Sequence, residues 1–145
     1  MFLRVVAAWL LALCLIVRWS AASETALGQS VRVGVYTAEQ ALRGQQQYDV
    51  FCSGCHGPDL EGAGVDVPAL ADTAFVRKWS GRSLRDIFDL IKMSMPENAP
   101  GSLGDRAYAD LLAYILQANG LPAGPVTLEA DRERLATIVF EQVSQ

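Results

Sequence analysis

The sequence predicts an all-α domain, because its clearest periodic segments are helical and no segment alternates strongly enough to predict a strand. In residues 83–93 and again in residues 105–120, apolar side chains recur with the spacing of one helical face. Residues 57–72 and 94–104 are rich in glycine and proline and predict two loops. Loops this long are uncommon in a small domain unless they carry a specific function.

Capping signals mark the expected helix starts. Thr37 and Gln40 have the spacing of a capping box, and good helix formers follow as far as Tyr48. Ser83 and Asp86 have the same spacing before the first apolar stripe. We therefore expect helices to begin just after the threonine and just after the serine.

Other local signals refine this pattern. Gly44 lies inside the first expected helix, where glycine costs about 1 kcal/mol relative to alanine, so it predicts close approach by another element. Residues 73–79 and 129–136 predict two further short helices. Asn119 and Gly120 supply a stop signal for the last long helix.

The N-terminus has the pattern of a secretory signal peptide. Arg4 precedes an unbroken apolar run, residues 5–17, and Arg18 follows it. This run of 13 residues is short of the roughly 20 that span a bilayer as a helix. Small residues end at Ala22, so we expect residues 1–22 to be removed and the protein to be periplasmic. An uncleaved anchor, which would bring membrane contact, is the alternative.

Length and charge narrow the class of protein. A chain of 145 residues fits one domain, which we place at residues 37–120, after a leader at 23–36. Residues 121–145 form a C-terminal extension, expected either to pack on the domain or to contact a partner. Cleavage would leave 10 basic and 16 acidic residues, so the formal charge would change from −4 to −6. Such an acidic chain lacks the basic stripe of a nucleic-acid binder.

The segment FCSGCHGPDL, residues 51–60, concentrates Cys52, Cys55 and the only histidine, His56. Outside the cytoplasm the two thiols could form a disulfide. A thioredoxin-like redox pair would need a βαβ context, which is missing. Structural zinc needs four ligands, and these three residues would need a carboxylate or a second molecule to complete the set. The remaining interpretation is covalent attachment of c-type haem.

The spacing of the three residues suits haem. One helical turn brings the thiols of Cys52 and Cys55 to one face, where they can bond the two vinyl-derived arms of one porphyrin edge. His56 can then turn its ring under the iron as an axial ligand, and Gly57 and Pro58 let the chain leave the ring plane. Export fits as well, since c-type haem is attached outside the cytoplasmic membrane. We expect one haem c.

The second axial ligand must come from elsewhere, because the chain has no second histidine. Met93 and Met95 are the methionines that remain after signal cleavage. We predict Met95, since it lies at i+4 from Ile91 on the apolar face and Pro96 biases it toward an extended conformation. A gap-filling core methionine, a lysine ligand and an open site are the alternatives.

With these residues identified, the chain resembles a class I cytochrome c over roughly residues 37–124. GQQQYDVFCSGCHGPDLEGAG and PALAD resemble the N-terminal helix, haem motif and following loop, while MPENAPGSLGDRAYADLLAYILQANGLPAG resembles the methionine loop and C-terminal helix. AYILQANGLPAG is most similar to cytochromes linked to bacterial quinoprotein alcohol dehydrogenases. The resemblance implies crossing terminal helices, with Gly44 at the contact and Tyr48 and Tyr114 packed around it.

The resemblance also implies further residues of the haem site. Pro68 matches the position whose carbonyl accepts a hydrogen bond from the ligating histidine. Leu70 would line the haem, and the indole N–H of Trp79 would reach a haem propionate, unless Trp79 is an ordinary half-buried aromatic. Four nearby basic residues are expected to form a solvated face, or else to steady propionates or dock an acidic partner: Arg77, Lys78, Arg82 and Arg85.

The sequence thus predicts a periplasmic electron-transfer protein rather than an enzyme, with one haem iron that cycles between ferrous and ferric states. The expected partners are redox proteins, namely a dehydrogenase, an oxidase or a cytochrome complex. Haem catalysis or gas sensing would need an open sixth coordination site. A zinc- or disulfide-stabilised interaction domain is a third hypothesis.

Overall fold

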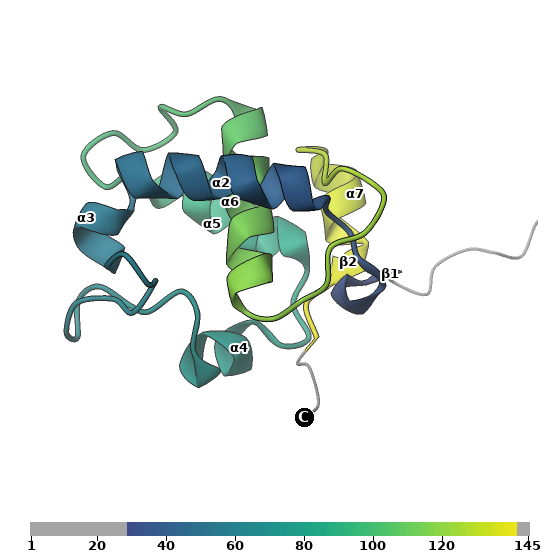
Figure 1. Cartoon of the computed structure of the whole chain (residues 1–145), viewed down its shortest axis with the longest axis horizontal. Coiled ribbons are helices and arrows are strands. Elements are labelled where there is room, and N and C mark those ends of the chain that lie inside the picture. Colours follow the sequence, from purple (N-terminus) through teal and green to yellow (C-terminus); the bar gives the residue numbers. More distant parts are fainter. Residues whose placement is uncertain (1–28, 142–145) are drawn as a thin grey trace, which may run out of the picture.

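Two crossing helices, α2 (Ala38–Phe51) and α6 (Asp105–Ala118), form the frame of the molecule (Figure 1). The computed structural model describes residues 29–141, so the predicted signal peptide lies outside the described residues. The remaining elements, in chain order, are β1 (Gln29–Ser30), η1 (Val31–Val33), α3 (Ser53–His56), α4 (Thr73–Trp79), α5 (Leu84–Ser94), α7 (Arg132–Ala136) and β2 (Ile138–Val139). None of the helices in this described part is long and apolar enough to cross a membrane.

The all-α fold class is confirmed, and the predicted helices are present. Strand content within residues 29–141 is limited to one parallel pair, β1 with β2, of two residues each. The helix predicted from residue 37 extends past Tyr48 to Phe51. The last short helix begins at Arg132 rather than 129, because the Asp131 side chain caps it by accepting hydrogen bonds from the backbone N–H groups of Glu133 and Arg134.

The crossing of α2 and α6 depends on Gly44. A Cβ atom at this position would collide with the backbone carbonyl of Asp110, so only glycine permits this approach. The rings of Tyr48 and Tyr114 pack at the same crossing with centroids 5.4 Å apart. Beside them, Arg43 forms a bidentate ion pair with the buried Asp110 carboxylate at 2.9 and 3.0 Å. The predicted close contact is therefore confirmed, and an ion pair that the sequence did not predict accompanies it.

The capping box predicted at Thr37 is only half formed. The Thr37 hydroxyl accepts from the backbone N–H of Gln40 at 3.1 Å, as predicted. The Gln40 side chain, however, is buried and bonds both backbone groups of Leu128, donating to its carbonyl at 2.9 Å and accepting from its N–H at 2.8 Å. The glutamine therefore joins the extension to α2. By contrast, the box between Ser83 and Asp86 is complete.

Residues 121–141 wrap around the domain together with the segment before α2. The Tyr36 hydroxyl donates to the Leu121 carbonyl at 2.5 Å, and the Gly124 N–H donates to the Tyr36 carbonyl at 2.7 Å. Leu128 and Leu135 are buried in the core. The leader and the extension therefore contribute to one hydrophobic core with the helices.

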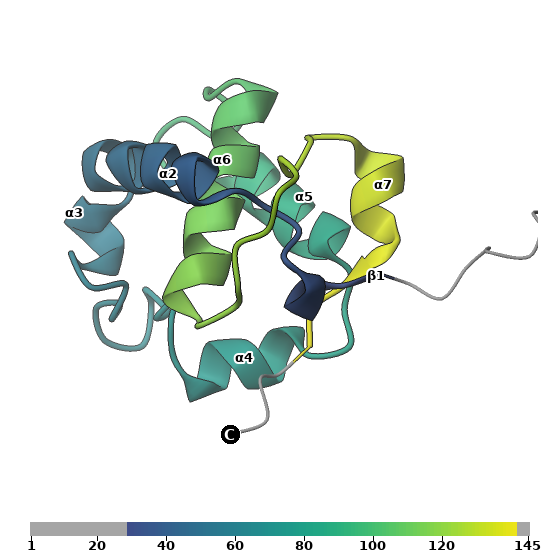
Figure 2. The same cartoon turned by 45° about the vertical axis from the view of Figure 1, so that its right-hand side comes forward.

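The end of the extension fastens α4 and α5 (Figure 2). Phe140 exchanges backbone hydrogen bonds with the turn between these helices, at 2.8 Å to Arg82 and 2.9 Å from Gly81. Its ring meets Phe75 of α4 edge-on, with centroids 6.1 Å apart. Arg132 of α7 reaches Asp89 of α5 at 2.6 Å. The C-terminal extension therefore contacts both α4 and α5.

Candidate functional site

The haem motif occupies the short helix α3, which follows α2 after one residue. Cys52 caps this turn, and its carbonyl accepts from the N–H groups of Cys55 and His56 at 3.1 and 2.9 Å. Both cysteines are free thiols, with Cys52 half-buried and Cys55 exposed. Burial, with a smaller effect from Cys55, raises the pKa of Cys52 to about 11. One buried-side and one solvent-side thiol on a single turn are placed to hold one edge of a planar group.

The His56 ring is buried and held in one orientation. Its side chain is 7% exposed, and its Nδ1 lies 2.9 Å from the carbonyl oxygen of Pro68. Because a carbonyl can only accept, Nδ1 must carry the proton, and Nε2 then keeps its lone pair. This is the arrangement by which a backbone carbonyl orients a metal-ligating histidine. The hydrogen bond predicted for Pro68 is present.

The loop after His56 is held by a hydrogen bond at Gly57 and by a tight turn at Gly62. The Tyr48 hydroxyl donates to the Gly57 carbonyl at 2.6 Å, and burial raises the pKa of this tyrosine, which keeps it a donor. Gly62 has a φ of +75°, and a Cβ there would lie 2.5 Å from the Val67 carbonyl oxygen. Glycine is therefore required for the loop to fold back on itself and present the Pro68 carbonyl.

Met95 occupies the end of α5, at the start of the second loop. Its backbone is extended, with φ −126° and ψ 150°, as the following proline predicted. Its carbonyl accepts from the hydroxyl of Tyr108 at 2.9 Å, and the same hydroxyl accepts from the Leu103 N–H at 3.3 Å. The Met95 residue is half-buried, whereas Met93 is 73% exposed. The Met95 backbone is therefore held to α6 through the Tyr108 hydroxyl.

Leu70 lies near the end of the first loop, and Trp79 ends helix α4, which follows that loop. Leu70 is partly buried against the core, and its carbonyl accepts from the Asn119 side chain at 2.8 Å. Trp79 is 4% exposed. Lys78 and Arg82 lie over its ring, 5.0 and 5.6 Å from the centroid. The indole is thus a buried aromatic bordered by two cations.

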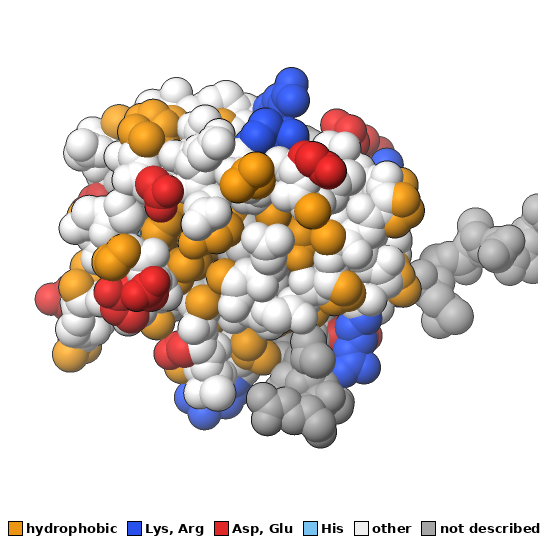
Figure 3. Space-filling model, viewed as in Figure 1, with side chains coloured by type: hydrophobic (Ala, Val, Ile, Leu, Met, Phe, Trp, Pro, Cys, Tyr) orange, Lys and Arg blue, Asp and Glu red, His pale blue; other side chains and the backbone are white. Residues whose placement is uncertain are grey.

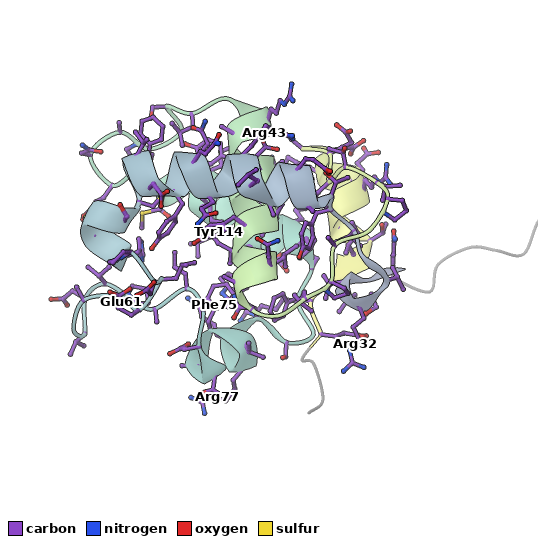
Figure 4. The ribbon with its side chains drawn as sticks, viewed as in Figure 1. Arg32, Arg43, Glu61, Phe75, Arg77 and Tyr114 are labelled. Carbon is purple, nitrogen blue, oxygen red and sulfur yellow. The ribbon has the colours of Figure 1, made fainter. Side chains whose placement is uncertain are left out.

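The side chains of α4 separate into an inner and an outer set. Figure 4 shows Phe75 directed from α4 toward α6, where Tyr114 lies, and Arg77 directed away from the domain. Lys78 and Arg82 are also exposed, whereas Arg85 is half-buried and pairs with Asp89 at 3.4 Å. The exposure of Arg77, Lys78 and Arg82 agrees with the solvated basic face that the sequence predicts.

The residues present fit a covalently attached haem. Two free thiols lie one turn apart, next to an imidazole whose Nε2 is left without a proton by the hydrogen bond at Nδ1. Within residues 29–141, no group of three histidine, cysteine or carboxylate side chains is arranged to hold a bare metal ion.

Two supporting residues escaped prediction from the sequence. Tyr108 was expected only as part of an apolar stripe, and Asn119 only as a helix stop, yet each bonds the backbone of a haem-site loop. A tyrosine inside an apolar stripe is a usable signal, because a buried hydroxyl needs a partner. No local signal identified the partner itself, which lies 13 or 49 residues away in sequence.

Comparison with known families gives one match. The model for the family described as cytochrome C oxidase, cbb3-type, subunit III matches residues 39–115, which is more than half of the chain. Comparisons with curated protein sequences and with solved structures gave no match. The family match supports a c-type cytochrome with a haem-based electron-transfer role, whereas the association with alcohol dehydrogenases stays a prediction. The chain belongs to this cbb3-type cytochrome c family, and its covalent haem c is attached through Cys52 and Cys55.

Proposed function

We propose that this protein is a periplasmic one-electron carrier whose haem iron is ligated by His56 and Met95. The observation that carries the proposal is the 2.9 Å hydrogen bond from His56 Nδ1 to the Pro68 carbonyl. This hydrogen bond fixes which ring nitrogen of the only histidine carries the proton, and it fixes the orientation of the ring. Both are features of a metal-ligating histidine. The buried position of the ring supports the same role.

Met95 is proposed as the second ligand for three reasons. Its thioether belongs to a half-buried residue, whereas the other methionine beyond the predicted signal, Met93, is 73% exposed. The extended backbone at Met95 ends helix α5, so its side chain does not follow the helical face of Met93. The Tyr108 hydroxyl holds the Met95 carbonyl, which limits how far this loop can move away.

When bound, haem c supplies a one-electron couple, and His/Met ligation raises its reduction potential. The chain supplies a stable environment for that couple. Tyr48 and Pro68 would hold the histidine side of the site, Tyr108 would hold the methionine side, and the apolar core would limit the access of water to the bound group. The Trp79 indole N–H, with Lys78 and Arg82 over its ring, would stabilise a negatively charged haem propionate. No step in this role transforms a substrate.

We also propose that the electron partner is a respiratory complex or a dehydrogenase that releases electrons outside the cytoplasmic membrane. The family description, which names an oxidase subunit, supports the first kind of partner, and the resemblance to dehydrogenase-linked cytochromes supports the second. The predicted signal peptide at residues 1–22 supports the periplasmic location. Fractionation of cells that express the full chain, followed by haem staining of the periplasmic extract, tests that location.

Axial ligation is tested by comparing Met95→Ala with Met93→Ala in the holoprotein. We expect Met95→Ala to lose the long-wavelength iron–sulfur charge-transfer band of the ferric protein and to lower the reduction potential, because the thioether is removed. Met93→Ala should keep both, since its side chain lies in solvent. Loss of the band in the Met93 variant alone, or in neither, would show that Met95 is not the ligand.

A further inference from the structure

Large apolar side chains are exposed around the point where the haem is attached. Val50 and Phe51, at the end of α2, are 73% and 45% exposed, and Val65, in the loop after α3, is completely exposed. Exposed apolar side chains grouped near one functional element mark an interaction surface more often than scattered ones do.

The same part of the chain is purely acidic. Residues 44–76 contain no lysine or arginine, while they contain five carboxylates, of which Asp72 caps α4. The other four are exposed and have no ion-pair partner in the described part of the chain: Asp49, Asp59, Glu61 and Asp66. Figure 3 shows acidic and apolar side chains at the left-hand end of the molecule, where Figure 1 places α3. Figure 4 places Glu61 on the loop beside α3.

A group of basic residues follows this acidic segment in the chain. Arg77, Lys78 and Arg82 follow within a few residues, on α4 and its adjoining turn, where no carboxylate occurs between Thr73 and Arg85. Figure 3 shows basic side chains at the lower edge, below the acidic end. The segment that carries the haem motif is therefore free of positive charge, and the nearest basic residues after it in sequence begin at Arg77.

We propose that the haem-motif face, defined as the last turn of α2, α3 and residues 57–67, docks a redox protein with a lysine- and arginine-rich surface. The exposed apolar residues would exclude water at the centre of the contact, and the carboxylates would attract and orient the basic partner. An acidic partner approaching this face would be repelled. This inference rests on the proposed electron-transfer function and adds the chemistry of the partner to it.

The test compares two variants with the same change in net charge. Asp59→Asn with Asp66→Asn neutralises the haem-motif face, and Glu129→Gln with Glu133→Gln neutralises two exposed carboxylates of the extension. None of these four side chains makes a hydrogen bond in the described residues, so both variants should fold. Mitochondrial cytochrome c, a lysine-rich redox protein, serves as the basic probe, and hexacyanoferrate(III) serves as the anionic oxidant.

At low ionic strength we expect the Asp59/Asp66 variant to exchange electrons with cytochrome c at least about threefold more slowly than the unmodified protein, since local charge steers association. Its oxidation by hexacyanoferrate(III) should be faster. The Glu129/Glu133 variant should change both rates by less than about half as much, and all differences should vanish near 1 M salt because charges are then screened beyond roughly 3 Å.

Equal effects of the two variants would overturn the proposal, because net charge alone would then set the rate. A faster reaction of the Asp59/Asp66 variant with cytochrome c would overturn it as well. Both variants are first shown to keep the visible spectrum and reduction potential of the unmodified holoprotein. If the unmodified haem exchanges electrons with neither probe, the electron-transfer function itself fails, which is a separate and recognisable result.

Discussion

At the scale of single residues, hydrogen bonds to backbone carbonyls hold the loops of the haem motif and of the proposed methionine ligand. His56 bonds the Pro68 carbonyl, Tyr48 the Gly57 carbonyl, and Tyr108 the Met95 carbonyl. A side chain that bonds a loop carbonyl restricts the backbone on both sides of that carbonyl. Such hydrogen bonds can therefore position a loop whose own side chains pack little. The loops around the haem are therefore held from the helices rather than by their own sequence.

The hydroxyl of Tyr48 provides a direct test of this arrangement. Tyr48→Phe should lower the free energy of unfolding by about 1–2 kcal/mol, because the Gly57 carbonyl loses its donor in a partly buried place. Denaturant unfolding of the holoprotein measures the change. Tyr114→Phe is the matched control, since its ring packs on Tyr48 but its hydroxyl makes no hydrogen bond within the described residues. Equal losses in the two variants would show that the hydrogen bond to Gly57 contributes nothing.

At the scale of elements, the C-terminal extension is part of the domain's core. Its backbone pairs with the α4–α5 turn through Phe140, and α7 is joined to α5 through Arg132 and Asp89. Because α5 ends at Met95, a contact that holds α5 also holds the start of the methionine loop. The extension therefore holds the helix that leads into the Met95 loop.

Removal of the Phe140 ring tests how strongly the extension contributes. Phe140→Ala should destabilise the holoprotein by about 3–5 kcal/mol, the usual cost of deleting a fully buried aromatic ring. Val126→Ala, in the exposed part of the same extension, should change stability by less than about 0.5 kcal/mol. Thermal or denaturant unfolding of both holoprotein variants measures these changes in stability. A Phe140 variant as stable as the Val126 variant would mean that the extension is only loosely attached.

Contacts between residues close in sequence could be predicted more readily than contacts between distant residues. The start of α5 could be predicted because Ser83 and Asp86 lie three residues apart, and helix caps are local. The exchange of hydrogen bonds between Gln40 and Leu128 could not, because it joins residues 88 apart and competes with the local capping box. The strands β1 and β2 were missed for a similar reason, since two residues give no alternating pattern to detect.

The candidate site was more predictable than the fold around it. Cys52, Cys55 and His56 form one contiguous motif, and the carbonyl of Pro68 was expected from the family resemblance. Residues that support the site from α6, such as Tyr108 and Asn119, act through backbone groups of other segments. Their side chains resemble ordinary core or capping residues until the segments are brought together.

At the scale of the whole molecule, an acidic face at the haem motif lies apart from the basic edge on α4. The core joins the leader, the crossing helices and the extension around one site. This organisation agrees with a carrier that must present one edge of its cofactor to a partner while it keeps the iron enclosed. A six-coordinate iron is the central requirement of that account, because an open site would favour ligand binding or catalysis instead.

The most direct measurement is the addition of carbon monoxide to the reduced, native holoprotein, followed by visible spectroscopy. If His56 and Met95 occupy both axial positions, the spectrum should stay unchanged on mixing, and Met95→Ala should bind carbon monoxide at once. Immediate carbon monoxide binding by the unmodified, folded protein would contradict the six-coordinate carrier and favour haem catalysis or gas sensing.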